Sequence, residues 1–357
     1  FKKESNKNNQ NNNLFMPINL SYKIGGTKVE KNVDLKVLKD LENVSISDPL
    51  INKKETLKSF QSLKSDENLK EVYISNDMNI VKPLILEEGY KLIISPGVKI
   101  NLEKEGLILI KGPLIMKGEK SNKIQINSSN GGKGILVLNS SEPSYISNAV
   151  FIGLNANTTS SNNVTGGLSF YNSKVEINSS EFIKSESEDA LNLVSSPFLI
   201  KDSYFSNVFS DAIDVDFSNG KIENSFFKNI GNDAIDISGA DVSIKDINIK
   251  YSGDKAISVG ERSKLYAKNI NISDSYVGVA SKDFSSVVIQ NLEIKNVPYC
   301  LAAYQKKPEY GPASIVAEDS ILSCQSNLLE KGSSIKESGY SLLPNTSSGY
   351  QQLYSFE

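Results

Sequence analysis

The sequence predicts an all-β solenoid, a parallel β-helix with about 22 residues per coil. Residues 189–283 fall into register at that interval, as DALNLVSSPFLIKDSYFSNVFS, DAIDVDFSNGKIENSFFKNIGN and DAIDISGADVSIKDINIKYSGD. Most of these lines open with a small residue and then alternate apolar with polar or small residues. Upstream, residues 83–129 carry short apolar segments separated by glycines at intervals too brief for helices. A fixed period of this length is typical of repeat architectures.

The N-terminal region lacks the repeat. Residues 1–13 are polar and of low complexity, which predicts a disordered tail. For residues 14–71 we expect a β-ribbon around Gly25-Gly26, followed by a short amphipathic helix over 53–69 that caps the open end of the solenoid. The β-helix itself is expected over 72–328, with a C-terminal cap or tail over 329–357.

Stacked coils need an apolar interior and polar bends. The third and fifth positions of each coil, such as Ile213 and Val215, are expected to point inward. A second inward column comprises Ile200, Ile222, Ile244 and Tyr266. Short polar residues recur near one bend, where they tolerate unusual backbone dihedrals: Asp202, Asn224, Asp246, Asn269 and Asn291.

The composition excludes several classes of function. Histidine is absent, which excludes histidine-activated serine or cysteine nucleophiles and histidine-ligated zinc. The net charge of −3 argues against a nucleic-acid partner. No apolar run approaches the roughly 20 residues of a membrane helix, so no transmembrane segment is expected. Cys300 and Cys324 fall at similar positions of successive coils, either as stacked reduced thiols or as a disulfide if the compartment is oxidising.

Acidic residues concentrate where the first strand of each coil faces outward, between Asp189 and Asp283. Like charges opposite one another destabilise a sheet, and aspartate is a poor strand former, so the fold alone does not account for this cluster. Three interpretations remain open. The acids are balanced by nearby lysines and arginine, or they form a Ca²⁺ site, or a carboxylate pair works as general acid and base on a glycosidic bond. Asp214 with Asp236 is the favoured pair.

The sequences DAIDVD, NDAIDISG and GDKAISVGERS resemble the right-handed parallel β-helix repeats of the pectin lyase-like superfamily, which includes pectate lyases, polygalacturonases and mannuronan epimerases. The resemblance implies a right-handed β-helix that acts on an acidic polysaccharide as a lyase or hydrolase. The histidine of the hydrolase motif and the D-P-H-D-type motif of the epimerases are both missing. A non-catalytic surface protein that binds a glycan or a protein partner is the alternative.

The candidate residues follow from this resemblance and from the acidic cluster. Expected catalytic residues are Asp214, Asp236, Lys255, Arg262 and Lys282. Expected substrate-binding residues are Asp211, Glu261, Asp283, Tyr304 and Lys306. Expected calcium ligands are Asp214, Asp216, Asp233 and Asp236, with Ca²⁺ as the only cofactor considered. We expect an extracytoplasmic protein, either secreted, periplasmic or at the cell surface. No signal-peptide pattern follows Phe1, so any leader or anchor is expected to have been removed or to lie outside this sequence.

Overall fold

The computed structural model describes residues 14–24, 27–37, 56–60, 63–156 and 164–354. Contacts divide the chain into two units, residues 1–52 and residues 53–357. The expected disordered tail over 1–13 lies outside the described residues. In the first unit, β1 (Leu14–Ile24) and β2 (Thr27–Val37) pair antiparallel, with Leu14 opposite Val37 and Ile24 opposite Thr27.

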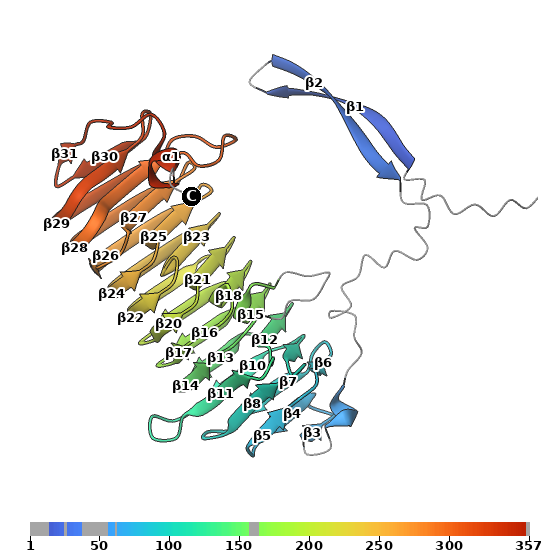
Figure 1. Ribbon diagram of the computed structural model, residues 1–357. Helices are drawn as coiled ribbons and strands as arrows, with labels where there is room; N and C mark the ends of the chain where they lie inside the picture. Colours follow the sequence, from blue (N-terminus) through green and yellow to red (C-terminus); the bar gives the residue numbers. More distant parts are fainter. Residues whose placement is uncertain (1–13, 25–26, 38–55, 61–62, 157–163, 355–357) are drawn as a thin grey trace, which may run out of the picture. The chain divides into compact units, whose positions relative to one another are not determined.

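The second unit is a parallel β-helix of about 11 turns, with about 23 residues per turn, as expected from the repeat. Figure 1 shows its strands stacked along the solenoid. Three faces surround the core. Face 1 is made by β6 (Leu84–Leu86), β9 (Ile108–Ile110), β12 (Ile135–Leu138), β15 (Gly166–Tyr171), β18 (Asp189–Val194), β21 (Asp211–Asp216), β23 (Ile235–Ser238), β25 (Lys255–Gly260) and β27 (Val277–Lys282).

The other two faces follow the same parallel pairing. Face 2 contains β4 (Glu71–Ile74), β7 (Lys91–Ile94), β10 (Leu114–Lys117), β13 (Ser144–Ser147), β16 (Val175–Asn178), β19 (Phe198–Lys201) and β30 (Ser334–Glu337). Face 3 contains β5 (Met78–Ile80), β8 (Lys99–Glu103), β11 (Ile124–Ser129), β14 (Ala149–Ile152), β17 (Glu181–Ile183) and β20 (Tyr204–Val208).

Toward the C-terminus the strands lengthen and bend from one face to the next. Faces 2 and 3 are shared by β22 (Gly220–Ile230), β24 (Asp241–Ser252) and β26 (Lys264–Ser273). All three faces are crossed by β28 (Ser286–Tyr304) and β29 (Ser314–Leu329). The remaining elements are η1 (Leu57–Ser59), β3 (Lys64–Asp66), β31 (Tyr340–Ser341) and α1 (Gly349–Tyr354).

The interior is apolar and dry, as alternation along the strands predicts. Ile213, Val215 and their counterparts on neighbouring coils are fully buried. Phe182, Phe205 and Phe227 stack on one another, with ring centroids 4.5 and 5.0 Å apart. Burying such ladders is the main stabilising contribution to a solenoid, because each coil covers the apolar surface of the next.

The helix expected over 53–69 is wrong for the described part of that segment. Leu57–Ser59 form a single 3₁₀ turn, and Lys64–Asp66 form β3, which pairs antiparallel with β4. The apolar spacing nevertheless identified the buried residues, because Leu57 and Phe60 join the core. Thr56 lies beside β6, where its hydroxyl donates to the Pro83 carbonyl and accepts the Ile85 N–H, each at 2.8 Å. These bonds, rather than helix formation, fix the segment at the end of the solenoid.

The bend residues behave as expected, whereas one core position is wrong. The five short polar residues of the bend all lie in the left-handed region, with φ between 46° and 60°. Their side chains bond one another between coils, as in the 2.9 Å bond from Asn291 to Asn269. Tyr266 is exposed, because it pairs with Ser243, and Ala267 takes the place opposite Ile244. This coil carries one residue more than the preceding ones, so counting by a fixed period shifts the face of the side chain.

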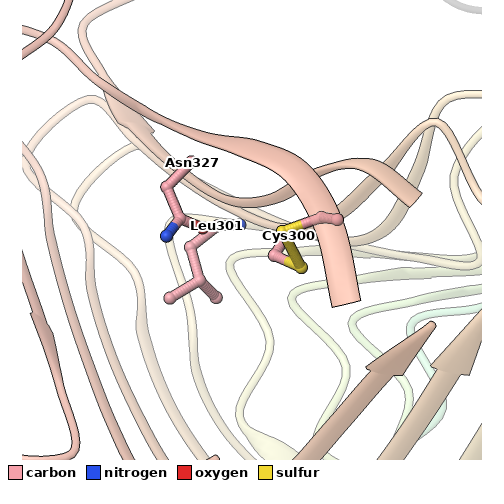
Figure 2. Close-up of a disulfide and its surroundings, with 4 residues drawn as sticks. Cys300, Leu301 and Asn327 are labelled. Carbon is pink, nitrogen blue, oxygen red and sulfur yellow. Dashed lines mark hydrogen bonds between the residues drawn. A yellow bond between two sulfur atoms is a disulfide. The ribbon is translucent and has the colours of Figure 1, made fainter. Parts of the chain in front are cut away.

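Cys300 and Cys324 form a disulfide between the last two full coils (Figure 2). Cys324 is opposite Val297 in the ladder, so the bond runs diagonally and the two thiols are not stacked at one position. The neighbouring Leu301 donates its backbone N–H to the side chain of Asn327 at 3.0 Å. No helix among the described residues is long and apolar enough to cross a membrane.

Candidate functional site

Face 1 carries six aspartates on consecutive strands, here called the acidic strip: Asp189, Asp211, Asp214, Asp216, Asp233 and Asp236. The parallel register places Asp189, Asp211, Asp233 and Lys255 in one column. Asn192, Asp214, Asp236 and Ser258 form a second column on the same face. The repeat therefore brings together side chains that lie 22 residues apart, as the sequence predicts.

The first column binds the backbone of the next coil. Asp211 accepts the N–H of Asp233 at 2.8 Å and the side-chain amide of Asn232 at 2.7 Å. Asp233 in turn accepts the N–H of Lys255 at 2.8 Å. Burial raises the pKa of Asp211 to about 8, with Asp233 adding to the shift, and raises that of Asp189 to about 7. This column holds the coils together, so the expected substrate role of Asp211 and the expected metal role of Asp233 are not apparent in its contacts.

Asp214 is the centre of the second column. Its Oδ2 accepts a 3.0 Å hydrogen bond from the amide of Asn192, one coil earlier. Burial raises the pKa of Asp214 well above its ordinary value, and Asp189, Asp216 and Asp236 raise it further. The protonated form is therefore favoured at neutral pH, because a carboxylate crowded by other carboxylates and removed from water is costly.

Asp236, directly opposite Asp214 on the next strand, has the reverse tendency. Lys282 Nζ lies 4.0 Å from its Oδ1, and its oxygen also accepts the N–H of Ile237 at 3.0 Å. Burial alone would raise the pKa of Asp236, but Lys282, Lys255 and the hydrogen bonds to its carboxylate together outweigh burial and lower it. The side chain keeps 24% of its surface exposed, so the ionised carboxylate is accessible from outside.

Beyond Asp216, a second set of charges lines the end of the strands. Glu261 accepts a 2.6 Å hydrogen bond from Ser238 and pairs with Lys307 at 2.6 Å. Burial raises the pKa of Asp216, and Asp236 and Glu261 contribute. Glu261, predicted to bind substrate, thus already has two partners, one on face 1 and one in the loop that follows β28.

Lys255 and Lys282 are both nearly buried, although the sequence suggested accessible bases. Lys255 Nζ lies 3.4 Å from Asp233 and also pairs with Asp254. Burial lowers the pKa of Lys255, but these two carboxylates outweigh burial and raise it well above its ordinary value. Since a general base must be deprotonated, Lys255 is poorly suited to that role.

The C-terminal helix α1 covers the adjoining end of face 1. Leu353 packs with Tyr304 and Leu328, and the Tyr354 hydroxyl donates to Asp254 at 2.9 Å. Tyr304, expected to bind substrate, is completely buried in this cluster and its ring is inaccessible to a sugar. Aromatic composition near the last coil suggested a stacking surface, but the ring fills the contact between face 1 and α1.

Asp283, which directly follows β27, contacts the loop after β28 that carries Lys306. Asp283 is fully buried, and its Oδ1 accepts the N–H groups of Lys306 and Lys307 at 2.7 and 2.8 Å. Its contacts therefore shape the loop, in place of the expected contact with substrate. Partial burial, together with Lys282 and Lys255, lowers the pKa of Lys306, whose amine stands near the strip.

Arg262 lies at the edge of face 1, between two aromatic rings. Its guanidinium is 5.8 Å from the ring centroid of Phe284 and 5.6 Å from that of Tyr310. These contacts orient the guanidinium by cation–π interaction. The adjacent acid, Glu261, pairs with Lys307.

The expected calcium ligands are not gathered into one cage. Among the residues that the structure describes, no group of three or more acidic or cysteine side chains is arranged to hold a metal ion. Asp233 is engaged with Lys255, and Asp236 lies beside Lys282, which supplies positive charge where a cation would otherwise be needed. The calcium site stays a prediction from the sequence.

Two further residues belong to the site and were not proposed as site residues. Asn192 orients Asp214. Tyr171 lies in the same environment, since burial raises its pKa to about 12 and Asp189, Asp216 and Asp214 add to that shift. The signal for both was the register of the repeat, because Asn192 lies one coil before Asp214 and Tyr171 lies two coils before Asp216.

A separate hollow of about 590 Å³ lies over face 2, away from the acidic strip. It is lined mainly by aliphatic stems and by Phe198 and Tyr266, with lysines and glutamates around it. The pair Lys201–Glu223, at 2.9 Å, closes one side. Since no acid–base pair with opposed pKa shifts is found there, the strip remains the better candidate for chemistry.

Comparison with known proteins supports the fold. Residues 190–327 match the family model described as right handed beta helix region, which confirms the expected right-handed parallel β-helix. No curated protein matches the sequence.

Solved structures with some similarity include the catalytic domain of GH87 α-1,3-glucanase D1069A in complex with nigerose, with a TM-score of 0.38, 12% identity and coverage of 79% of this chain and 66% of that one. PfbA, a surface adhesin of Streptococcus pneumoniae, has a TM-score of 0.33 and 10% identity, and the match covers 79% of this chain and 90% of that one. The catalytic unit of a thermostable GH87 α-1,3-glucanase from Streptomyces thermodiastaticus has a TM-score of 0.31 and 12% identity, and the match covers 72% of this chain and 64% of that one. The chain thus spans just under two thirds of the glucanase domains, and similarity at this level carries no information about activity.

Proposed function

We propose that the acidic strip hydrolyses glycosidic bonds of an acidic, uronate-containing polysaccharide, with Asp214 as general acid and Asp236 as the ionised partner. The observation that supports this assignment is the opposed pKa shift of two carboxyls that face each other on adjacent strands. One carboxyl kept protonated beside one kept ionised is the arrangement that glycoside hydrolysis requires.

In this scheme Asp214 donates its proton to the glycosidic oxygen as the bond to the anomeric carbon breaks. Asp236 either removes a proton from the attacking water or adds to the anomeric carbon before water releases the sugar. Asn192 holds Asp214 in place through their hydrogen bond, and Lys282 keeps Asp236 ionised. The ionised Asp236 also stabilises the positive charge that develops on the sugar ring.

The proposed substrate class follows from the cations beside the strip. Lys306 and Arg262 lie beside its C-terminal end and suit a substrate that carries carboxylates, whereas the nearly buried Lys282 faces Asp236. The strip extends over several coils, which suits a polymer. We also propose an extracytoplasmic location, supported by the Cys300–Cys324 disulfide, since disulfides persist in oxidising compartments.

The test is a screen of polygalacturonate, alginate, dextran and mannan for new reducing ends. We expect Asp214→Asn and Asp236→Asn each to lower the rate on the cleaved polysaccharide by about 10²–10⁴-fold. The alkaline limb of the wild-type pH profile should lie well above the ordinary pKa of a carboxyl, because Asp214 must stay protonated. Asp241→Asn, an exposed aspartate on face 2, serves as the control and should keep full activity.

Unchanged rates in both Asp214→Asn and Asp236→Asn would show that these two residues are not the catalytic pair. A cleaved product with an unsaturated end, detected by its ultraviolet absorbance, would indicate a lyase instead. The lowered pKa of Lys306 favours that second candidate, because a less basic lysine is more readily deprotonated to act as base. Calcium would then be added to the same assay, since it can acidify the proton beside a uronate carboxylate.

The third outcome is binding without cleavage of any of the four polysaccharides. That result would support the alternative of a non-catalytic surface protein that presents the same strip to a glycan. It would also indicate that the pKa shifts in the strip reflect only the stacking of aspartates in the fold.

A further inference from the structure

An exposed phenylalanine stands in an unusual backbone conformation at the edge of the acidic strip. Phe217 directly follows β21, has φ of 51° and keeps 66% of its surface exposed. Left-handed backbone is rare for bulky side chains and is adopted more readily by Gly or Asn. The same left-handed turn follows the other strands of face 1 from β15 to β27, with φ between 47° and 63° at Asn172, Ser195, Gly239, Glu261 and Asp283. The recurring turn of the solenoid therefore accounts for the backbone at Phe217, but it does not require an exposed apolar side chain there.

The ring of Phe217 lies against a glycine of the next coil. A Cβ added to Gly239 would stand 2.6 Å from Phe217 Cδ1 and 2.8 Å from its Cε1. Only glycine leaves room for the ring at this point. The ring is therefore held against the turn, while most of its surface remains open to solvent. A supported, exposed aromatic face beside carboxylates is suited to stack on a sugar ring.

The same edge holds a second oriented group further along the solenoid. Arg262 follows β25, two coils after Phe217, which corresponds to about 10 Å along the axis. Its guanidinium contacts the rings of both Phe284 and Tyr310, and these two contacts favour one orientation before any ligand binds. Phe284 has the same left-handed conformation, with φ of 68°, and a Cβ on Gly311 would stand 2.5 Å from its Cε2. A stacked guanidinium keeps its N–H edge available for a carboxylate or sulfate.

We propose that this edge is a glycan-binding rail, in which Phe217 stacks on one sugar ring and Arg262 binds the carboxylate of a sugar further along the same chain. The occupant is an acidic polysaccharide running along the solenoid axis, because the two groups lie on the same side of the strip and supply stacking and charge recognition in turn. The rail rests on the proposed function for the identity of its ligand, but not on catalysis. It adds binding residues outside the carboxylate pair and explains the exposed aromatic ring of Phe217.

The test measures retardation of the full chain in native gels containing polygalacturonate or dextran, in an Asp214→Asn background that prevents cleavage. Phe217→Asn should weaken binding of polygalacturonate by roughly three- to tenfold, the range expected for loss of one aromatic contact. Asn is well tolerated in left-handed backbone, so the melting temperature should be unchanged or higher. Arg262→Gln should weaken binding of polygalacturonate and leave any binding of dextran unchanged.

Two matched controls lie elsewhere on the solenoid. Tyr251→Asn replaces another exposed aromatic residue with left-handed backbone, φ 62°, at the end of β24. Lys264→Gln removes one exposed positive charge from face 2. Both should bind as the background does. The proposal is overturned if Phe217→Asn and Arg262→Gln bind as tightly as the background, or if the background binds neither polysaccharide.

A change of molar mass in Phe217→Asn, measured by light scattering, would also overturn the proposal, because it would identify the edge as a self-association surface. The catalytic assignment is tested separately. Binding that depends on Phe217 without any cleavage supports the rail and rejects hydrolysis. Cleavage that depends on Asp214 but not on Phe217, with an unchanged KM, rejects the rail alone.

Discussion

The aspartates in the two columns of face 1 have different roles. Asp211 and Asp233 each accept the backbone N–H of the following coil, a contact that a stacked sheet uses for cohesion. Asp214 and Asp236 lie in the second column, where one carboxyl is crowded by acids and the other faces Lys282. The difference arises from position within the strand, because residues two or three places apart meet different parts of the neighbouring coil.

The first column predicts an unusual dependence of stability on pH. The pKa of Asp211 is about 8 in the folded protein, above its ordinary value of 3.8. A carboxyl with a raised pKa stabilises the folded state below about pH 4 and loses that contribution as the pH rises through 8. We expect the melting temperature to fall over this interval, with Asp189 and Asp233 acting in the same direction through their pKa values of about 7 and 6.

Asp211→Asn should flatten this decline by on the order of 1–2 kcal/mol, because the amide still accepts the N–H of Asp233 but takes up no proton. Thermal unfolding between pH 4 and pH 9 measures the effect. Asp241→Asn on face 2 provides the comparison and should follow wild type. A mutant curve that falls as steeply as that of wild type would contradict a raised pKa at Asp211.

At the scale of the elements, the sequence predicted which residues lie opposite each other on adjacent strands more reliably than it predicted which side chains are buried. The 22-residue repeat placed Asp214 opposite Asp236 and identified the left-handed bend column. It failed at Tyr266, where one added residue moves the side chain to the opposite side of the sheet. Burial of Lys255 and Tyr304 could not be predicted either, because α1, which covers them, comes from a segment outside the repeat.

The disulfide gives an element-scale prediction. Cys300 and Cys324 enclose a loop with a sequence separation of 24, so the bond restricts the unfolded chain and should contribute about 2–4 kcal/mol. In a solenoid each coil contacts only its neighbours, so replacing both cysteines by alanine should reduce hydrogen-exchange protection mainly in β28 and β29. Protection in β11 should remain.

A reductant applied to wild type distinguishes the bond from the packing of the sulfur atoms. It should reproduce the local loss of protection seen in the double mutant. Equal protection before and after reduction would show that the bond contributes no stability. Loss of protection spread evenly from β11 to β29 would show instead that the solenoid unfolds as one cooperative unit.

For the whole solenoid, the repeat explains how the inner coils pack on one another, but it does not determine which residues close the two ends. Every inner coil is covered by the coils on either side, as the ladder of Ile213, Ile235 and Ile257 illustrates. An end has an open core and unpaired strand edges, and it must be closed by residues that do not follow the repeat. This is why the periodic part of the sequence predicted the fold well, and why the closing segment was assigned as a helix and found as a 3₁₀ turn and a strand.

The segment that covers the N-terminal end of the solenoid should therefore prevent two molecules from associating end to end. Leu57 and Phe60 cover the first coil, and Thr56 occupies the hydrogen bonds of β6. Replacing Leu57 and Phe60 together by aspartate should uncover this core and edge, and molecules should then join end to end. Light scattering should show a mass that rises with concentration above that of wild type. Lys58→Asp alone changes the net charge by the same two units on the exposed side of the same turn and should leave the mass unchanged. If the Leu57 and Phe60 variant keeps the wild-type mass at every concentration, this segment is not what prevents end-to-end association.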